Sequence, residues 1–278
     1  MVWLKQMQTE QGNLRTALSW SLDEDAEEPD GGREELGLRL AAALFWFWYT
    51  HDYLTEGRRY LERTVSSRGD PTTTRLKARA LNGASRIALS QGDFGAAKAL
   101  IEEGLALYRE LGDEEGIAAA LTDLGLVAVL GQRDDMPVKA VLEELGELKP
   151  RLKNRNTLAY LLLFEGTLAA SQGDLEHSVA LQEQSLKLFR EIQDTPGTIW
   201  CLGNLGGIAL VRGDYEGALP LLREALRLGW ESDYKVPSQF SLYLLAGVAA
   251  SQEQPVRAAR LWGPWKTWRR LTACTSRP

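Results

Sequence analysis

The residues that could carry acid–base, nucleophilic or metal chemistry are few and scattered along the chain. The two histidines, His51 and His177, are far apart, and neither Cys201 nor Cys274 has ligand neighbours at the spacing that zinc sites use. Carboxylates are plentiful, but their runs are typical of a solvated helix face. The sequence contains no Gly-x-x-x-x-Gly-Lys-Ser/Thr phosphate loop. We therefore expect no catalytic residue, no metal site, no cofactor and no enzymatic activity.

Composition narrows the class of protein further. The 278 residues are 44% hydrophobic and 25% charged, with a net charge of -6. This balance argues against a disordered chain and against a dedicated nucleic-acid-binding protein. The longest apolar stretch, residues 40–49, is about half as long as the roughly 20 residues that span a bilayer. The scarce cysteines and the lack of a secretion signal predict a cytoplasmic protein that does not bind membranes.

A 40-residue period organises the chain. Segments 91–94, 172–175 and 212–215 each read Gly-Asp followed by an apolar or aromatic residue, and weaker copies occur at the other turns. The six residues that follow the turn are spaced by 40, 41, 40, 40 and 40 positions: Leu54, Phe94, Asp135, Leu175, Tyr215 and Pro255. A fixed period of this size is typical of a solenoid, in which each repeat packs on its neighbours.

Each period reads as a helix, a short turn and a second helix. Apolar residues recur at helical spacing on both sides of the turn. The turn glycines are expected to adopt a positive φ, and the following aspartates to cap the next helix. An alanine also stands five residues before the turn aspartate in repeat after repeat, which predicts close packing of the first helix.

The sequence therefore predicts an all-α solenoid, a right-handed superhelix of antiparallel helix pairs with about 40 residues per repeat. We expect a single domain over residues 1–278. Residues 1–37 are interpreted as an N-terminal capping helix and an acidic loop. The six repeats are expected at 38–77, 78–117, 118–158, 159–198, 199–238 and 239–278.

The repeat residues resemble those of tetratricopeptide repeats, with a small residue in the first helix, Gly-Asp-Tyr at the turn and two alanines in the second helix. The best copy has Gly206, Gly213, Asp214, Tyr215, Ala218 and Ala225. The repeat is longer than the usual 34 residues. Sequence segments such as residues 13–20 and 57–63 make the chain similar to the MalT-like helical sensor domain of bacterial LuxR-type and STAND ATP-dependent transcriptional regulators. The resemblance covers roughly residues 10–262.

That resemblance implies a sensor array that follows a nucleotide-binding module and receives an inducer or a partner protein. The chain departs from these regulators because it lacks the phosphate loop, and no segment resembles a DNA-reading helix-turn-helix. It corresponds to the sensor part alone, either as a separate protein or as a fragment of a larger regulator.

Ligands of tetratricopeptide arrays usually lie against set positions of the first helices, which form the concave face. Transferring those positions gives a candidate binding set in five repeats: Arg79, Asn82, Arg86, Thr122, Asp123, Tyr160, Phe164, Thr167, Trp200, Asn204, Phe240 and Tyr243. Aromatic rings beside Arg and Asn groups suit an extended peptide, a partner helix or a saccharide. The alternative is that Tyr160, Trp200 and Phe240, which are one repeat apart, pack between helices.

The C-terminal end is unlike the repeats. Residues 257–278 contain six basic residues, no acidic residue and three tryptophans. The segment from 264 onward is interpreted either as a patch for a nucleic-acid or membrane surface, or as the product of a frameshift or truncation that replaced the native end.

Two functions remain open at this point. The first is a non-catalytic tetratricopeptide module that binds a protein or peptide segment, or a small inducer such as a saccharide, in a bacterial transcription-regulatory or signalling system. It makes no direct contact with nucleic acid. The second is an oligomerisation scaffold that self-associates into a homo-oligomer without a small-molecule ligand.

Overall fold

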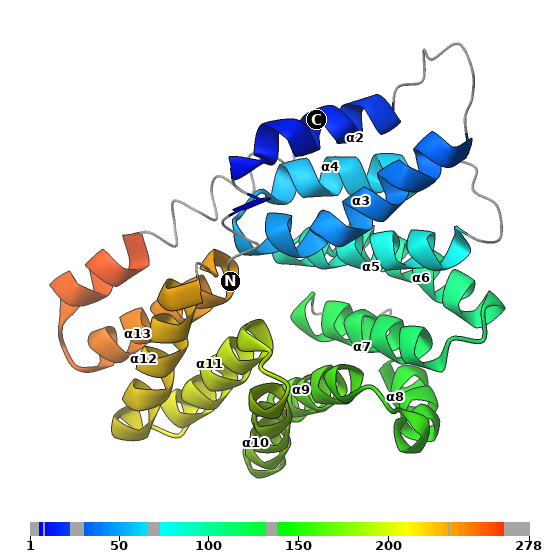
Figure 1. The fold of residues 1–278 in the computed structure, drawn as a ribbon. Helices are drawn as coiled ribbons and strands as arrows, with labels where there is room; N and C mark the ends of the chain where they lie inside the picture. The colour runs from blue at the N-terminus through cyan, green and yellow to red at the C-terminus, as the bar shows by residue number, and fades with distance from the viewer. Residues whose placement is uncertain are drawn as a thin grey trace. The chain divides into compact units, whose positions relative to one another are not determined.

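The structure is a computed structural model that describes residues 6–7, 9–22, 31–65, 73–131, 138–232 and 234–263, with backbone alone for 31 and 235–239. Every regular element in these ranges is a helix, which confirms the all-α prediction (Figure 1). The chain divides into two compact units, an N-terminal unit of residues 1–124 and a C-terminal unit of residues 125–278. The acidic loop at 23–30 and the tail at 264–278 lie outside the described residues.

The N-terminal unit begins with α2 (Gln11–Ser21), which packs on α3 (Gly31–Thr50). The chain continues into α4 (Leu54–Val65), α5 (Thr74–Ser90), α6 (Phe94–Glu110) and α7 (Glu114–Leu130), and the boundary between the units falls within α7. Consecutive helices pack as antiparallel pairs, α3 with α4 and α5 with α6, and α3 also contacts α5.

The C-terminal unit contains α8 (Val138–Leu148), the short 3-10 helix η1 (Lys149–Arg151), α9 (Arg155–Ser171), α10 (Leu175–Glu191), α11 (Thr195–Val211), α12 (Tyr215–Ser232) and α13 (Lys235–Ser251). A further helical stretch covers 255–263. The second helix α10 packs on α9 and α11, and α12 packs on α11 and α13, while the first helices α9, α11 and α13 contact in sequence. This is the solenoid arrangement that the period predicts.

The helix lengths explain why the repeat has 40 residues. In the α9–α10 repeat, two helices of 17 residues are joined and followed by turns of three residues, 172–174 and 192–194. The α5–α6 repeat has the same dimensions. The first helices begin at Thr74, Glu114, Arg155, Thr195 and Lys235, a few residues before the repeat starts expected from the sequence.

The turns combine a left-handed residue with a capping aspartate. Gly92, Gly173 and Gly213 have φ of 75°, 86° and 76°. The carboxylates of Asp93, Asp174 and Asp214 accept hydrogen bonds from backbone N–H groups in the first turn of the next helix, at 3.1, 3.1 and 2.8 Å. Both predictions for these turns are confirmed.

The same turns share a backbone hydrogen bond that ends the first helix. The backbone N–H groups of Asp93, Asp174 and Asp214 donate to the carbonyls of Ala88, Ala169 and Ala209, at 2.9, 3.0 and 2.9 Å. This hydrogen bond, from the residue after the left-handed position to a carbonyl five residues earlier, closes the helix end.

Large side chains lie over glycines of neighbouring helices. Tyr108 of α6 covers Gly116 of α7, and Phe189 of α10 covers Gly197 of α11, so that a Cβ at either glycine would overlap the ring. Each of these glycines also donates its N–H to a capping aspartate, Asp113 or Asp194. At each of these turns between repeats, the same glycine is therefore held by a capping aspartate and covered by an aromatic ring.

No described helix is both long and apolar enough to cross a membrane. The right-handed superhelical path, the single-domain organisation and the repeat boundaries stay predictions.

The turn geometry predicts opposite effects for two glycine substitutions. Gly173→Ala should lower the free energy of unfolding by about 1 kcal/mol, because alanine is strained at a φ of 86°. Gly247→Ala should raise it by about 0.5–1 kcal/mol, because Gly247 is exposed within α13 and a Cβ there meets no atom within 4 Å. Urea unfolding followed by circular dichroism measures both. Equal effects of the two substitutions would contradict the assigned turn.

Candidate functional site

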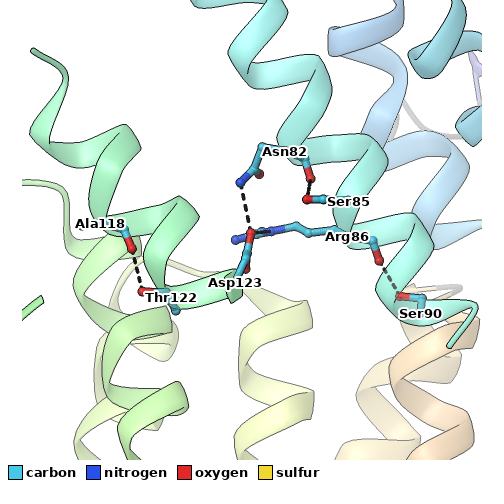
Figure 2. Close-up of polar contacts among 7 residues, drawn as sticks. All are labelled: Asn82, Ser85, Arg86, Ser90, Ala118, Thr122 and Asp123. Carbon is cyan, nitrogen blue, oxygen red and sulfur yellow. Dashed lines mark hydrogen bonds and ion pairs between the residues drawn. The ribbon is translucent and has the colours of Figure 1, made fainter. Parts of the chain in front are cut away.

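Three of the predicted binding residues form a buried polar cluster in the N-terminal unit (Figure 2). Asn82 Nδ2 and Arg86 Nε, both on α5, donate to Asp123 Oδ2 on α7 at 3.0 and 2.9 Å. The Asp123 side chain is 4% exposed and that of Arg86 is 18% exposed. A buried carboxylate needs such partners, and the Asp123 carboxylate in turn neutralises the Arg86 guanidinium. This cluster therefore ties two first helices together.

The two other candidates in this unit differ in exposure. Thr122 is buried, and its hydroxyl donates to the carbonyl of Ala118 in its own helix at 2.7 Å. Arg79 is exposed on α5. Its charge, with that of Arg86, acts on the nearby Tyr108 phenol, but burial is the larger effect and raises the pKa of Tyr108 to about 12.

The C-terminal unit has an uncharged polar pair at the corresponding place. Asn204 Nδ2 on α11 lies 3.4 Å from Thr167 Oγ1 on α9, a long hydrogen bond. These residues are 37 positions apart, as are Arg86 and Asp123. The helical stack thus brings the same two positions of successive first helices together, once as an ion pair and once as an amide with a hydroxyl.

Aromatic residues also occur on the first helices of this unit, before and after the polar pair in the sequence. Trp200 and Phe240 have ring centroids 5.7 Å apart, and Tyr243 and Trp262 have centroids 5.1 Å apart. Tyr243 is 36% exposed, whereas Trp200 and Phe240 are half-buried. We call Tyr160, Thr167, Trp200, Asn204, Phe240 and Tyr243 the first-helix face of the C-terminal unit.

Packing accounts for part of the aromatic set. Tyr160 meets Phe189 edge-on at 4.8 Å, and both Tyr160 and Trp200 pack against the core formed by α9, α10 and α11. Phe164 is fully buried, and its ring lies over Gly125. Phe164 and Thr122 are therefore core residues in this structure, whereas Tyr160 and Trp200 are half-buried against the core.

The residues considered for chemistry lie apart from this face. His51 is buried between α3 and α4, where Nδ1 lies 3.0 Å from Thr50 Oγ1, and His177 is exposed on α10. Burial raises the pKa of the Cys201 thiol to about 12, and its Sγ lies 3.3 Å from Ser185 Oγ. Within the described ranges, no three His, Cys, Asp or Glu side chains are grouped to hold a metal ion.

One residue near this face was missed at the level of sequence. Gln182 of α10 is fully buried, and its Nε2 lies 3.2 Å from the Leu163 carbonyl and 3.5 Å from Thr167 Oγ1. Aligning the repeats could have revealed Gln182, because the corresponding residues of α6 and α12 are the apolar Ile101 and Leu222.

Comparison with known proteins agrees with the helical-repeat fold. Residues 157–229 match the family model described as tetratricopeptide repeat. No curated protein matches the sequence.

Several solved structures share the fold. One is a Rap protein complexed with Competence and Sporulation Factor, with a TM-score of 0.65, 11% identity and coverage of 91% of this chain and 80% of that chain. Another is a Signal Transduction ATPase with Numerous Domains (STAND) protein with a tetratricopeptide repeat sensor from Pyrococcus horikoshii. It gives a TM-score of 0.60 at 15% identity, with 91% of this chain covered. This chain spans 40% of that protein.

A third similar structure is BtubC from P. vanneervenii, with a TM-score of 0.54, 15% identity and coverage of 82% of this chain and 93% of that chain. Identities this low establish the fold alone. The chain thus has the all-helical repeat fold of these structures, and residues 157–229, from α9 to α12, match the tetratricopeptide repeat family.

The Arg86–Asp123 pair generates a stability prediction. Arg86→Met should lower the free energy of unfolding by about 3 kcal/mol, because it leaves a carboxylate that is 4% exposed without its cation. Adding Asp123→Asn removes the stranded charge, so the double variant should be more stable than Arg86→Met alone. A double-mutant cycle by urea unfolding measures this coupling. Additive effects would show that the pair contributes no interaction energy.

Proposed function

We propose that the chain is a non-catalytic binding or sensing module that holds a peptide or protein segment on the first-helix face of its C-terminal unit. The observation that carries the proposal is the combination of half-buried Trp200 and Phe240 rings, the more exposed Tyr243 and the Asn204–Thr167 pair on consecutive first helices. Half-buried rings provide contact area at low entropic cost, while an amide fixes the orientation of a ligand.

The N-terminal unit fits this role less well. Asp123 engages both Asn82 and Arg86, so a ligand would have to displace a buried ion pair. In the C-terminal unit, none of the residues of the first-helix face is charged, and no ion pair must break.

The biological setting belongs to the same proposal. The resemblance of the sequence to MalT-like sensor domains, together with a fold shared with a tetratricopeptide repeat sensor and with a Rap protein complexed with a factor, supports a cytoplasmic role in bacterial signalling or transcription control. In a larger regulator, this module would receive the signal and other domains would act on it.

Binding to an array of immobilised short peptides tests the proposal. Asn204→Ala with Tyr243→Ala should weaken capture at least about tenfold, because the pair supplies an amide and an exposed aromatic ring to the proposed face. The urea midpoint should change little, since neither residue is buried.

Trp230→Ala is the matched control, because Trp230 is a large aromatic residue that is 89% exposed on the second helix α12. It should leave capture unchanged. Loss of capture in Trp230→Ala alone would place the site on the second helices. Mass that rises with concentration in sedimentation, without capture of any peptide, would favour the self-associating scaffold.

A further inference from the structure

The interface within the α9–α10 pair is polar where the corresponding interfaces of the α5–α6 and α11–α12 pairs are apolar. Three positions of each second helix face the first helix of its pair. They are Ala97, Ile101 and Gly104 in α6, and Ala218, Leu222 and Ala225 in α12. In α10 the same positions are Ser178, Gln182 and Ser185, and all three are fully buried.

These side chains donate to backbone carbonyls of α9. Ser178 Oγ donates to the carbonyl of Gly166 at 2.7 Å, and Ser185 Oγ donates to that of Ala159 at 2.7 Å. The two serines therefore satisfy their hydroxyl protons locally, and they reach no residue of the first-helix face.

Gln182 is different because its burial is costly. Its Oε1 is buried without a hydrogen-bond partner. A Cβ at Gly166 would lie 2.8 Å from Gln182 Nε2, so the glycine is needed to admit the side chain. Leu222 fills the corresponding place over Gly206 with no polar atom to satisfy. A leucine at 182 would thus be the more stable choice, and the glutamine calls for a function.

The hydrogen bonds around Thr167 show which of its neighbours must act as donors. The Thr167 hydroxyl has one proton, and it goes to the Leu163 carbonyl at 2.8 Å. The amide groups that approach Thr167 Oγ1 must therefore present N–H, from Gln182 at 3.5 Å and from Asn204 at 3.4 Å. Because its Nδ2 donates to Thr167, Asn204 has its Oδ1 left as the acceptor for another partner.

We propose that Gln182 is a positioning residue that fixes the polarity of the Thr167–Asn204 pair, so that the first-helix face selects an uncharged segment with N–H donors over an anion. An extended peptide backbone between apolar side chains has this chemistry. The inference rests on the proposed function.

The test uses two probes that share a phenyl ring, N-acetylphenylalaninamide, which offers N–H groups, and 3-phenylpropionate, which is an anion. Each is titrated into the full chain while NMR follows the Trp200 indole and Asn204 side-chain amide signals. The wild-type protein should bind the amide about fivefold or more tightly than the anion, the worth of about one hydrogen bond.

Gln182→Leu should bring this preference close to one while raising the urea midpoint. Gln182→Met, which keeps an unbranched side chain without a donor, should do the same and serves if the leucine variant folds poorly. Ser178→Ala is the control, because it removes a buried hydroxyl of the same interface that does not reach Thr167. It should keep the preference.

Each outcome decides between the claims. An equal affinity for both probes in the wild type, or a preference that survives both Gln182 variants, overturns the positioning role and leaves the binding face standing. If neither probe shifts the Trp200 or Asn204 signals, the proposed face and this inference both fail.

Discussion

Every described Gly-Asp reversal of the chain depends on one backbone hydrogen bond, from the residue after a left-handed position to a carbonyl five residues earlier. At Asp93, Asp174 and Asp214 this bond measures 2.9–3.0 Å, and the same aspartates then cap the next helix. Because the turn has a fixed length, it also fixes the rotation of one helix relative to the next. Two such turns and two 17-residue helices make the 40-residue repeat, and the repeat sets which side chains meet.

The same spacing of 37 residues serves two purposes in the two units. Between α5 and α7 it brings Arg86 to Asp123, and the buried ion pair holds the helices together. Between α9 and α11 it brings Thr167 to Asn204, an uncharged pair that belongs to the proposed binding face. Under that proposal, the two units use the same backbone geometry, and the side chains decide which role a repeat takes.

Features that depend on residues close in the sequence were predictable, whereas contacts between neighbouring helices were not. The period, the helix pairs, the left-handed glycines and the capping aspartates all depend on residues within one turn, so their spacing reveals them. The covering of Gly116 by Tyr108, the pairing of Arg86 with Asp123 and the burial of Phe164 depend on neighbouring helices. Gln182 is intermediate, since comparison with Ile101 and Leu222 marks it as unusual but its contact with Thr167 requires the fold.

Site-specific photo-crosslinking tests the central claim, which is that a partner lies on the first-helix face of the C-terminal unit. A photo-reactive amino acid is placed at position 243 in one protein and at position 230 in another, since Tyr243 and Trp230 are exposed aromatic residues on a first and a second helix. The account predicts an adduct with a partner peptide or protein from position 243 and none from position 230. Adducts from position 230 alone, or crosslinks only between copies of this chain, would contradict it.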